Sequence, residues 1–168
     1  MKSKYWTRMT QMKFEIQYLK CHHARNVSIN RLISIIQACI STGALAGLFA
    51  GQKYSFISSI ILVISQFFTA AKPYLPYEYR INELEKGLYY FEELFNEVER
   101  DWSKINSSTE NDEAEIEKML EKYKEKWLRM NGSILKKDAL PVKRAFIEKA
   151  NKEKNSYFER FYGENENE

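Results

Sequence analysis

Two long apolar runs dominate the hydrophobic pattern of this chain. They cover residues 32–52 and 54–71, and the nearest charged side chains are Arg31, Lys53 and Lys72. A helix of about 20 apolar residues, with a range of roughly 17–25, crosses the hydrocarbon core of a bilayer. Two such runs in tandem predict an all-α membrane protein built on a two-span transmembrane helical hairpin. The tight turn between the spans is expected at residue 53.

A heptad pattern follows the hairpin within residues 72–106. Apolar residues recur there at spacings of four and three, which predicts a long cytoplasmic amphipathic helix with a coiled-coil seam. The positions of this heptad seam are Ile81, Leu84, Leu88, Phe91, Phe95, Val98, Trp102 and Ile105. The leader, residues 1–31, carries a similar apolar stripe at Tyr5, Met9, Met12, Ile16 and Leu19. The simplest partner for the seam is the leader of the same chain, and pairing between chains remains the alternative.

Residues 107–168 are expected to form further cytoplasmic helices with an acidic tail. The polar run from Ser107 to Asp112 breaks the heptad pattern and supplies residues that favour a helix N-terminus. Gly132 is expected to end the helix that follows. Pro141 is expected near the start of a last helix.

The distribution of charge predicts the orientation of the hairpin. Residues 1–31 contain seven Lys or Arg and one acid, Glu15, whereas the turn contains only Lys53. Positive charge beside a span stays in the cytoplasm, so we expect a multi-pass protein of the cell (inner) membrane with both termini cytoplasmic. The net charge is +3 for the whole chain. Because the excess of positive charge lies in the leader, it suits anionic lipid headgroups better than nucleic acid, and no nucleic-acid partner is expected.

Polar and small side chains form stripes on the two predicted spans. The candidate pore-lining residues are Asn30, Ser34, Gln37 and Ser41 on the first, and Ser55, Ser59, Gln66 and Thr69 on the second. Polar groups in a span face protein or water rather than lipid. These two polar seams either pair with each other inside one hairpin or line a pore in a homo-oligomer. Helix packing is expected at the glycines Gly43, Gly47 and Gly51, which allow close approach.

Residues for catalysis, cofactor binding or metal binding do not stand out in the sequence. Cys21, His22 and His23 are consecutive, and neighbouring residues on a helix point about 100° apart, so they do not converge on one metal ion. The sequence has no phosphate-binding loop, no dinucleotide fingerprint and no nucleophile with a neighbouring base. We therefore expect a protein that is not an enzyme and has no cofactor.

The order of these features resembles the SLATT family, the SMODS- and SLOG-associating two-transmembrane effectors of bacterial conflict systems. The motifs that carry the resemblance lie at 18–25 (YLKCHHAR), 75–81 (LPYEYRI), 99–102 (ERDW) and 139–141 (ALP), with Lys149, Ala150 and Tyr157 in the last helix. The resemblance implies an antiviral membrane effector that oligomerises into a pore and causes abortive infection, meaning cell death or growth arrest on a nucleotide-linked signal. It also implies a separate signalling or sensor protein as a partner, besides the lipid bilayer. The alternative is an anchor that holds a cytoplasmic partner at the membrane without a pore.

Overall fold

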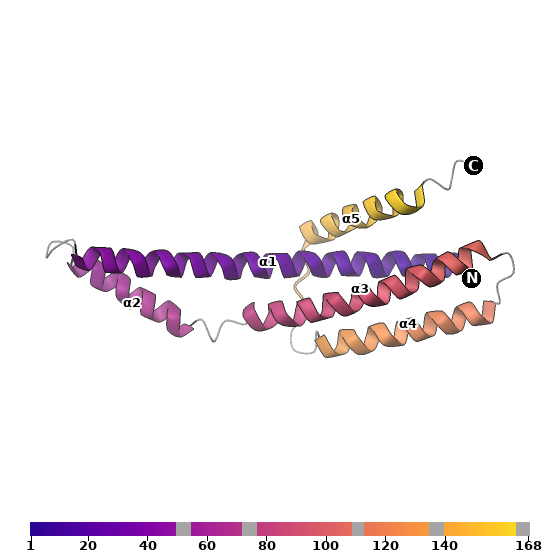
Figure 1. Cartoon of the computed structure of the whole chain (residues 1–168), viewed down its shortest axis with the longest axis horizontal. Helices are drawn as coiled ribbons and strands as arrows, with labels where there is room; N and C mark the ends of the chain where they lie inside the picture. The colour runs from indigo at the N-terminus through magenta and orange to yellow at the C-terminus, as the bar shows by residue number, and fades with distance from the viewer. Residues whose placement is uncertain (50–54, 72–76, 109–112, 135–139, 164–168) are drawn as a thin grey trace. The chain divides into compact units, whose positions relative to one another are not determined.

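The computed structural model of this chain describes residues 1–49, 55–71, 77–108, 113–134 and 140–163, and for residues 41–49, 55, 57, 58, 62, 68, 77, 78, 133 and 134 it describes the backbone only. All regular elements in these ranges are helices, so the predicted all-α class is confirmed (Figure 1). The helices are α1 (Lys2–Phe49), α2 (Ser55–Ala71), α3 (Tyr77–Ser107), α4 (Glu113–Ile134) and α5 (Arg144–Tyr162). The predicted turn at residue 53 lies outside the described residues.

The chain divides into two compact units. The first, here called the bundle unit, comprises Met1–His23 and Glu83–Glu168. The second, here called the hairpin unit, comprises Ala24–Asn82. The helix α1 contributes residues to both units, because it continues from the leader into the first apolar run.

The helix α1 is 48 residues long, and its sequence explains this length. It contains no proline, and its first glycine is Gly43, so no residue in the leader interrupts the backbone hydrogen bonds. The sequence predicts either one long helix over the leader and the first apolar run or two helices with a small kink, and the structure has a single helix there.

The core of the bundle unit lies between the first part of α1 and α3, which run antiparallel. The hydroxyl of Tyr5 donates a 3.0 Å hydrogen bond to the carbonyl oxygen of Val98, and Lys20 forms a 2.5 Å ion pair with Glu92. The five apolar residues of the leader stripe are all buried. The heptad seam is buried from Leu84 to Ile105, and Ile81 at its start is half-buried. Within the described residues, the seam therefore packs against the leader of its own chain.

The helices α4 and α5 complete the bundle unit, and each contacts both α1 and α3. The ring of Trp127 on α4 lies 4.1 Å from that of Phe91, measured between centroids. On α5, the ring of Phe158 lies 5.0 Å from Trp6. The expected stop at Gly132 is wrong, because α4 continues to Ile134. A Cβ atom at position 132 would meet no atom within 4 Å, so the glycine is simply an exposed helical residue.

The two predicted spans can be compared with the helices of the structure. Among the residues that it describes, no helix combines the length and the apolarity needed to cross a membrane.

Candidate functional site

Two polar side chains join the helices of the hairpin unit. The amide Nε2 of Gln37 on α1 donates a 2.9 Å hydrogen bond to the hydroxyl Oγ1 of Thr69 on α2. That hydroxyl donates in turn to the carbonyl oxygen of Ser65 at 2.9 Å. This polar contact lies between the two helices; the side chain of Ser65 is buried there and that of Thr69 is exposed. The two predicted polar seams thus meet at Gln37 and Thr69.

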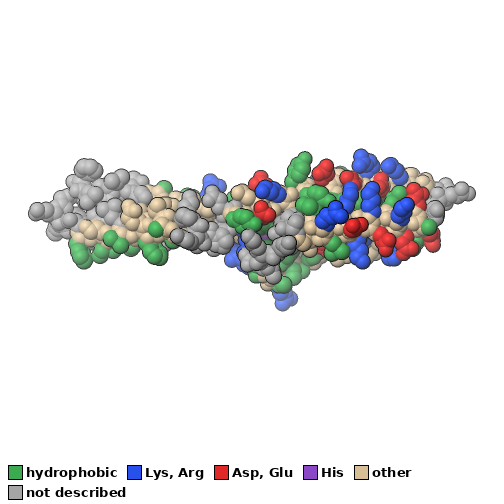
Figure 2. Space-filling model, turned by 90° about the horizontal axis from the view of Figure 1, so that it is seen from below, with side chains coloured by type: hydrophobic (Ala, Val, Ile, Leu, Met, Phe, Trp, Pro, Cys, Tyr) green, Lys and Arg blue, Asp and Glu red, His purple; other side chains and the backbone are tan. Residues whose placement is uncertain are grey.

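Large apolar side chains cover the outside of the hairpin unit. On α2, Phe56, Val63 and Phe67 are 78%, 69% and 70% exposed, and Ile60 on the same face is also exposed. On α1, the exposed apolar residues are Leu32, Ile35 and Ile36. The side chains drawn in colour over this unit in Figure 2 are mostly hydrophobic, whereas acidic and basic side chains alternate over the bundle unit. A helix pair that exposes this many large apolar side chains differs from a water-soluble bundle, which buries such side chains in its core.

The remaining predicted polar positions are distributed over different faces. Asn30 is half-buried and Ser34 is exposed on α1, while Ser59 and Gln66 are exposed on α2. The side chains of Ser41 and Ser55 lie outside the described part of the chain. Gly43 and Gly47 lie in α1, but their surroundings are not described. Gly51 lies outside the described residues. The described part of the hairpin unit therefore joins one polar pair across the helices and leaves Ser59 and Gln66 on its surface.

A second candidate site lies in the bundle unit, where α5 begins. The hydroxyl of Tyr18 on α1 donates to the carbonyl oxygen of Pro141 at 3.2 Å and accepts from the backbone N–H of Lys143 at 3.4 Å. The ring of His22 packs edge-on against both Tyr18 and Phe146, at 4.8 Å in each case. Tyr18 and Pro141, which belong to two of the motifs that carry the family resemblance, are therefore in contact. Their contact is not visible in the sequence, because more than 100 residues separate them.

The middle and the end of α5 are held by a half-buried carboxylate. One oxygen of Glu99 on α3 accepts hydrogen bonds from the hydroxyls of Tyr157 at 2.6 Å and Tyr162 at 2.8 Å. The ammonium of Lys13 on α1 lies 3.3 Å from the centre of the Tyr157 ring and 4.4 Å from that of Phe95. We call Lys13, Glu99, Tyr157 and Tyr162 the α5 clasp.

The environment of the α5 clasp shifts the pKa values of its members. Burial lowers the pKa of Lys13 to about 8, although the nearby Glu99 carboxylate acts in the opposite direction. Burial and the hydrogen bond to Glu99 raise the pKa values of Tyr157 and Tyr162 above the usual range. Both phenols therefore stay protonated at neutral pH and can donate to the carboxylate. The clasp joins α1, α3 and α5 through one charge-assisted network.

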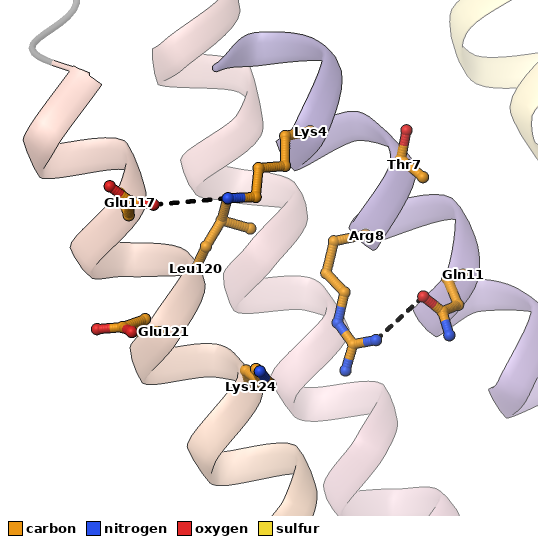
Figure 3. A pocket seen from close by; sticks show the side chains of 8 residues that line it. All are labelled: Lys4, Thr7, Arg8, Gln11, Glu117, Leu120, Glu121 and Lys124. Carbon is orange, nitrogen blue, oxygen red and sulfur yellow. Dashed lines mark hydrogen bonds and ion pairs between the residues drawn. The ribbon is translucent and has the colours of Figure 1, made fainter.

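A shallow groove of about 410 Å³ separates α1 from α4. Its lining residues are Lys4, Thr7, Arg8, Gln11, Glu117, Leu120, Glu121 and Lys124. Figure 3 shows Lys4 reaching towards Glu117, at 3.5 Å, and Arg8 towards Gln11, at 3.1 Å. The charges of both signs compensate one another along the groove, so its lining does not favour an anionic or a cationic ligand.

The carboxylate of Glu15 lies on the same side of α1 and provides a test of the contact with α4. It accepts a 3.0 Å hydrogen bond from Gln11, and Trp127 of α4 lies near it. Burial raises the pKa of Glu15, and Arg8, Gln11 and Trp127 only partly offset that effect. A carboxyl group whose pKa is higher in the folded chain than in the unfolded chain loses its stabilising contribution as the pH rises through the folded pKa.

We therefore expect Glu15→Gln to raise the midpoint of thermal unfolding at pH 7 by about 1–3 °C. The advantage should shrink towards pH 4, where the parent carboxyl is protonated in both states. The measurement is circular dichroism of the full chain in a mild detergent at both pH values. Glu93→Gln, at an exposed position of α3, is the matched control and should leave the midpoint unchanged. A lower midpoint for Glu15→Gln at pH 7 would contradict the prediction.

Comparison with protein-family models, curated proteins and solved structures gives no match to this chain. The resemblance to the SLATT family therefore stays a prediction from the sequence.

Proposed function

We propose that this chain is a membrane effector of a bacterial conflict system. Its hairpin unit inserts into the cell membrane as two spans, and assembled hairpins open or disrupt the bilayer. The result is cell death or growth arrest in response to a nucleotide-linked signal, which a separate sensor protein provides. The observation that carries the proposal is the apolar exterior of the hairpin unit, where Phe56, Val63 and Phe67 are exposed while Gln37 bonds to Thr69 across the two helices.

The physical basis of insertion is the transfer of this exterior from water to lipid. Burial of a large aliphatic or aromatic side chain contributes about 1.5–3 kcal/mol, and the exposed apolar residues of α1 and α2 all gain this contribution in hydrocarbon. The 17 residues of α2 span about 26 Å. A bilayer core of about 30 Å adapts to a shorter helix by local thinning, at a modest cost per ångström.

A charge on the exterior tests insertion directly. We expect Ile64→Lys to remove most of the protein from the membrane fraction, because Ile64 is exposed at the middle of α2 and a lysine near the centre of a span costs about 2.5–3.5 kcal/mol. The control is Tyr89→Lys on α3, where the parent side chain is 74% exposed in the bundle unit; this variant should stay in the membrane. The measurement is the amount of protein that resists alkaline extraction of membranes. Equal extraction of the two variants would contradict insertion.

Labelling of single cysteines tests the orientation. In a background without Cys21 and Cys39, we expect Gln52→Cys to react with an impermeant maleimide on intact spheroplasts. Ser108→Cys, at the exposed end of α3, should react only after lysis, because the basic leader keeps both termini in the cytoplasm. Reaction of Ser108→Cys from outside would overturn this topology.

Membrane depolarisation separates the pore from the anchor. The anchor hypothesis is favoured by the Gln37–Thr69 hydrogen bond, since polar groups that bond to each other across the two helices need no water-filled centre. If the protein acts as a pore, its induced expression should depolarise cells, and the purified protein should release dye from liposomes. Protein that stays in the membrane fraction without depolarisation or leakage would make the anchor the better function.

A further inference from the structure

We propose that one flank of α2 is the contact surface for a second copy of this chain, with the two Gln66 amides hydrogen-bonded to each other. This flank, here called the Gln66 flank, consists of Ser59, Val63, Gln66 and Ala70. The inference rests on the proposed insertion of the hairpin unit into a membrane. It specifies which face of the hairpin another copy contacts.

The spacing of the Gln66 flank is that of a helix-pairing seam. Its residues follow one another at intervals of four, three and four, which puts them on one face of α2. All four are exposed in the structure. The buried Ser65 precedes Gln66 by one residue and therefore points about 100° away from it. The contact with α1 and the Gln66 flank thus occupy different sides of the same helix.

The side-chain amide of Gln66 needs a hydrogen-bond partner within the membrane. Its amide carries both hydrogen-bond donors and an acceptor. In the described part of the chain it makes no hydrogen bond, in contrast to Gln37, which is bonded to Thr69. An amide exposed to hydrocarbon is costly because no water is present to satisfy it. A second copy in the same orientation brings an identical amide to the same depth, and the two amides can donate to each other.

The shape of the surface also suits a second helix. Ser59 and Ala70 are small and lie at the two ends of the flank, so they allow close approach of another helix.

Cysteine crosslinking at matched depth tests the surface. Val63→Cys lies in the flank and Ile64→Cys one residue away, about 100° around the helix, and both parent side chains are exposed. In membranes of cells that express the cysteine-free full chain with either change, a membrane-permeable oxidant should produce several-fold more dimer at position 63. Adding Gln66→Leu should lower the dimer yield about three- to tenfold, the effect of losing one interhelical polar contact, whereas Gln66→Asn should retain much of it.

The outcomes separate this inference from the proposed function. Loss of the unmodified hairpin from the membrane fraction would defeat the proposed function itself. Membrane-resident protein that crosslinks equally at positions 63 and 64 would overturn the Gln66 flank as the contact surface. Strong crosslinking at position 63 that Gln66→Leu leaves unchanged would overturn the pairing of the amides.

Discussion

Replacing Phe91 with alanine is expected to lower the free energy of unfolding of the bundle unit by about 3–5 kcal/mol. The Phe91 side chain is 1% exposed, and its ring packs on Trp127 of α4 at 4.1 Å between centroids. Truncation removes this burial and leaves a cavity between α1, α3 and α4. The expected result is a clear fall in the midpoint of chemical unfolding of the full chain, followed by tryptophan fluorescence.

The neighbouring Tyr89 provides the control for this prediction. Its side chain is 74% exposed, so Tyr89→Ala should change the stability by no more than about 0.5 kcal/mol. Both changes remove an aromatic ring from the same turn of α3, and only burial distinguishes them. Equal losses at the two positions would show that α3 does not use the Phe91 face as its core.

Replacing Glu99 with leucine is expected to release α5 while leaving α4 in place. The change removes the acceptor of two short hydrogen bonds, from Tyr157 and Tyr162, and it removes a carboxylate whose charge acts on Lys13. Hydrogen bonds to a charged group contribute about 1.5–3 kcal/mol each and are not fully additive here, so we expect a loss of about 2–4 kcal/mol in the docking of α5. The measurement is hydrogen exchange, in which amides between Arg144 and Tyr162 should lose protection.

The matched control for this experiment is Glu97→Leu. Glu97 lies two residues earlier on α3 and pairs with Lys126 of α4 at 2.8 Å. Its replacement should affect α4 and leave α5 unchanged, because Glu97 contacts α4 whereas Glu99 contacts α5. Loss of protection in α5 to the same degree in both variants would mean that the α5 clasp has no specific role. Glu99→Gln keeps an acceptor without the charge and should give an intermediate result.

The bundle core could be predicted from the sequence because it follows helical periodicity. The leader stripe and the heptad seam were located by spacing alone, and the structure buries both, except for the half-buried Ile81. Leu94, which is also buried, was missed because it lies beside the strict four-three pattern. A second apolar position of this kind is expected wherever a helix packs against more than one neighbour.

The docking of α5 could not be predicted from the sequence for a different reason. Its contacts join Tyr18 to Pro141 and Glu99 to Tyr157, pairs that are far apart along the chain and follow no local spacing. Each participant is a common surface residue when considered alone. In the hairpin unit, spacing placed eight polar residues in two seams, but it could not distinguish those that face the other helix, such as Thr69, from those that face outwards, such as Gln66.

The division of the chain also fixes an order of events during synthesis. The bundle unit consists of two segments, and the hairpin unit lies between them in the sequence. The apolar stripe of Met1–His23 therefore emerges from the ribosome about 60 residues before α3, against which it is buried.

Closing a flexible loop of that length costs about 3–4 kcal/mol of chain entropy. A hairpin that has already folded shortens the effective loop and lowers that cost. We therefore expect the nested hairpin to form first and the bundle to close around its two ends, with the leader stripe exposed to chaperones or to the membrane surface until then.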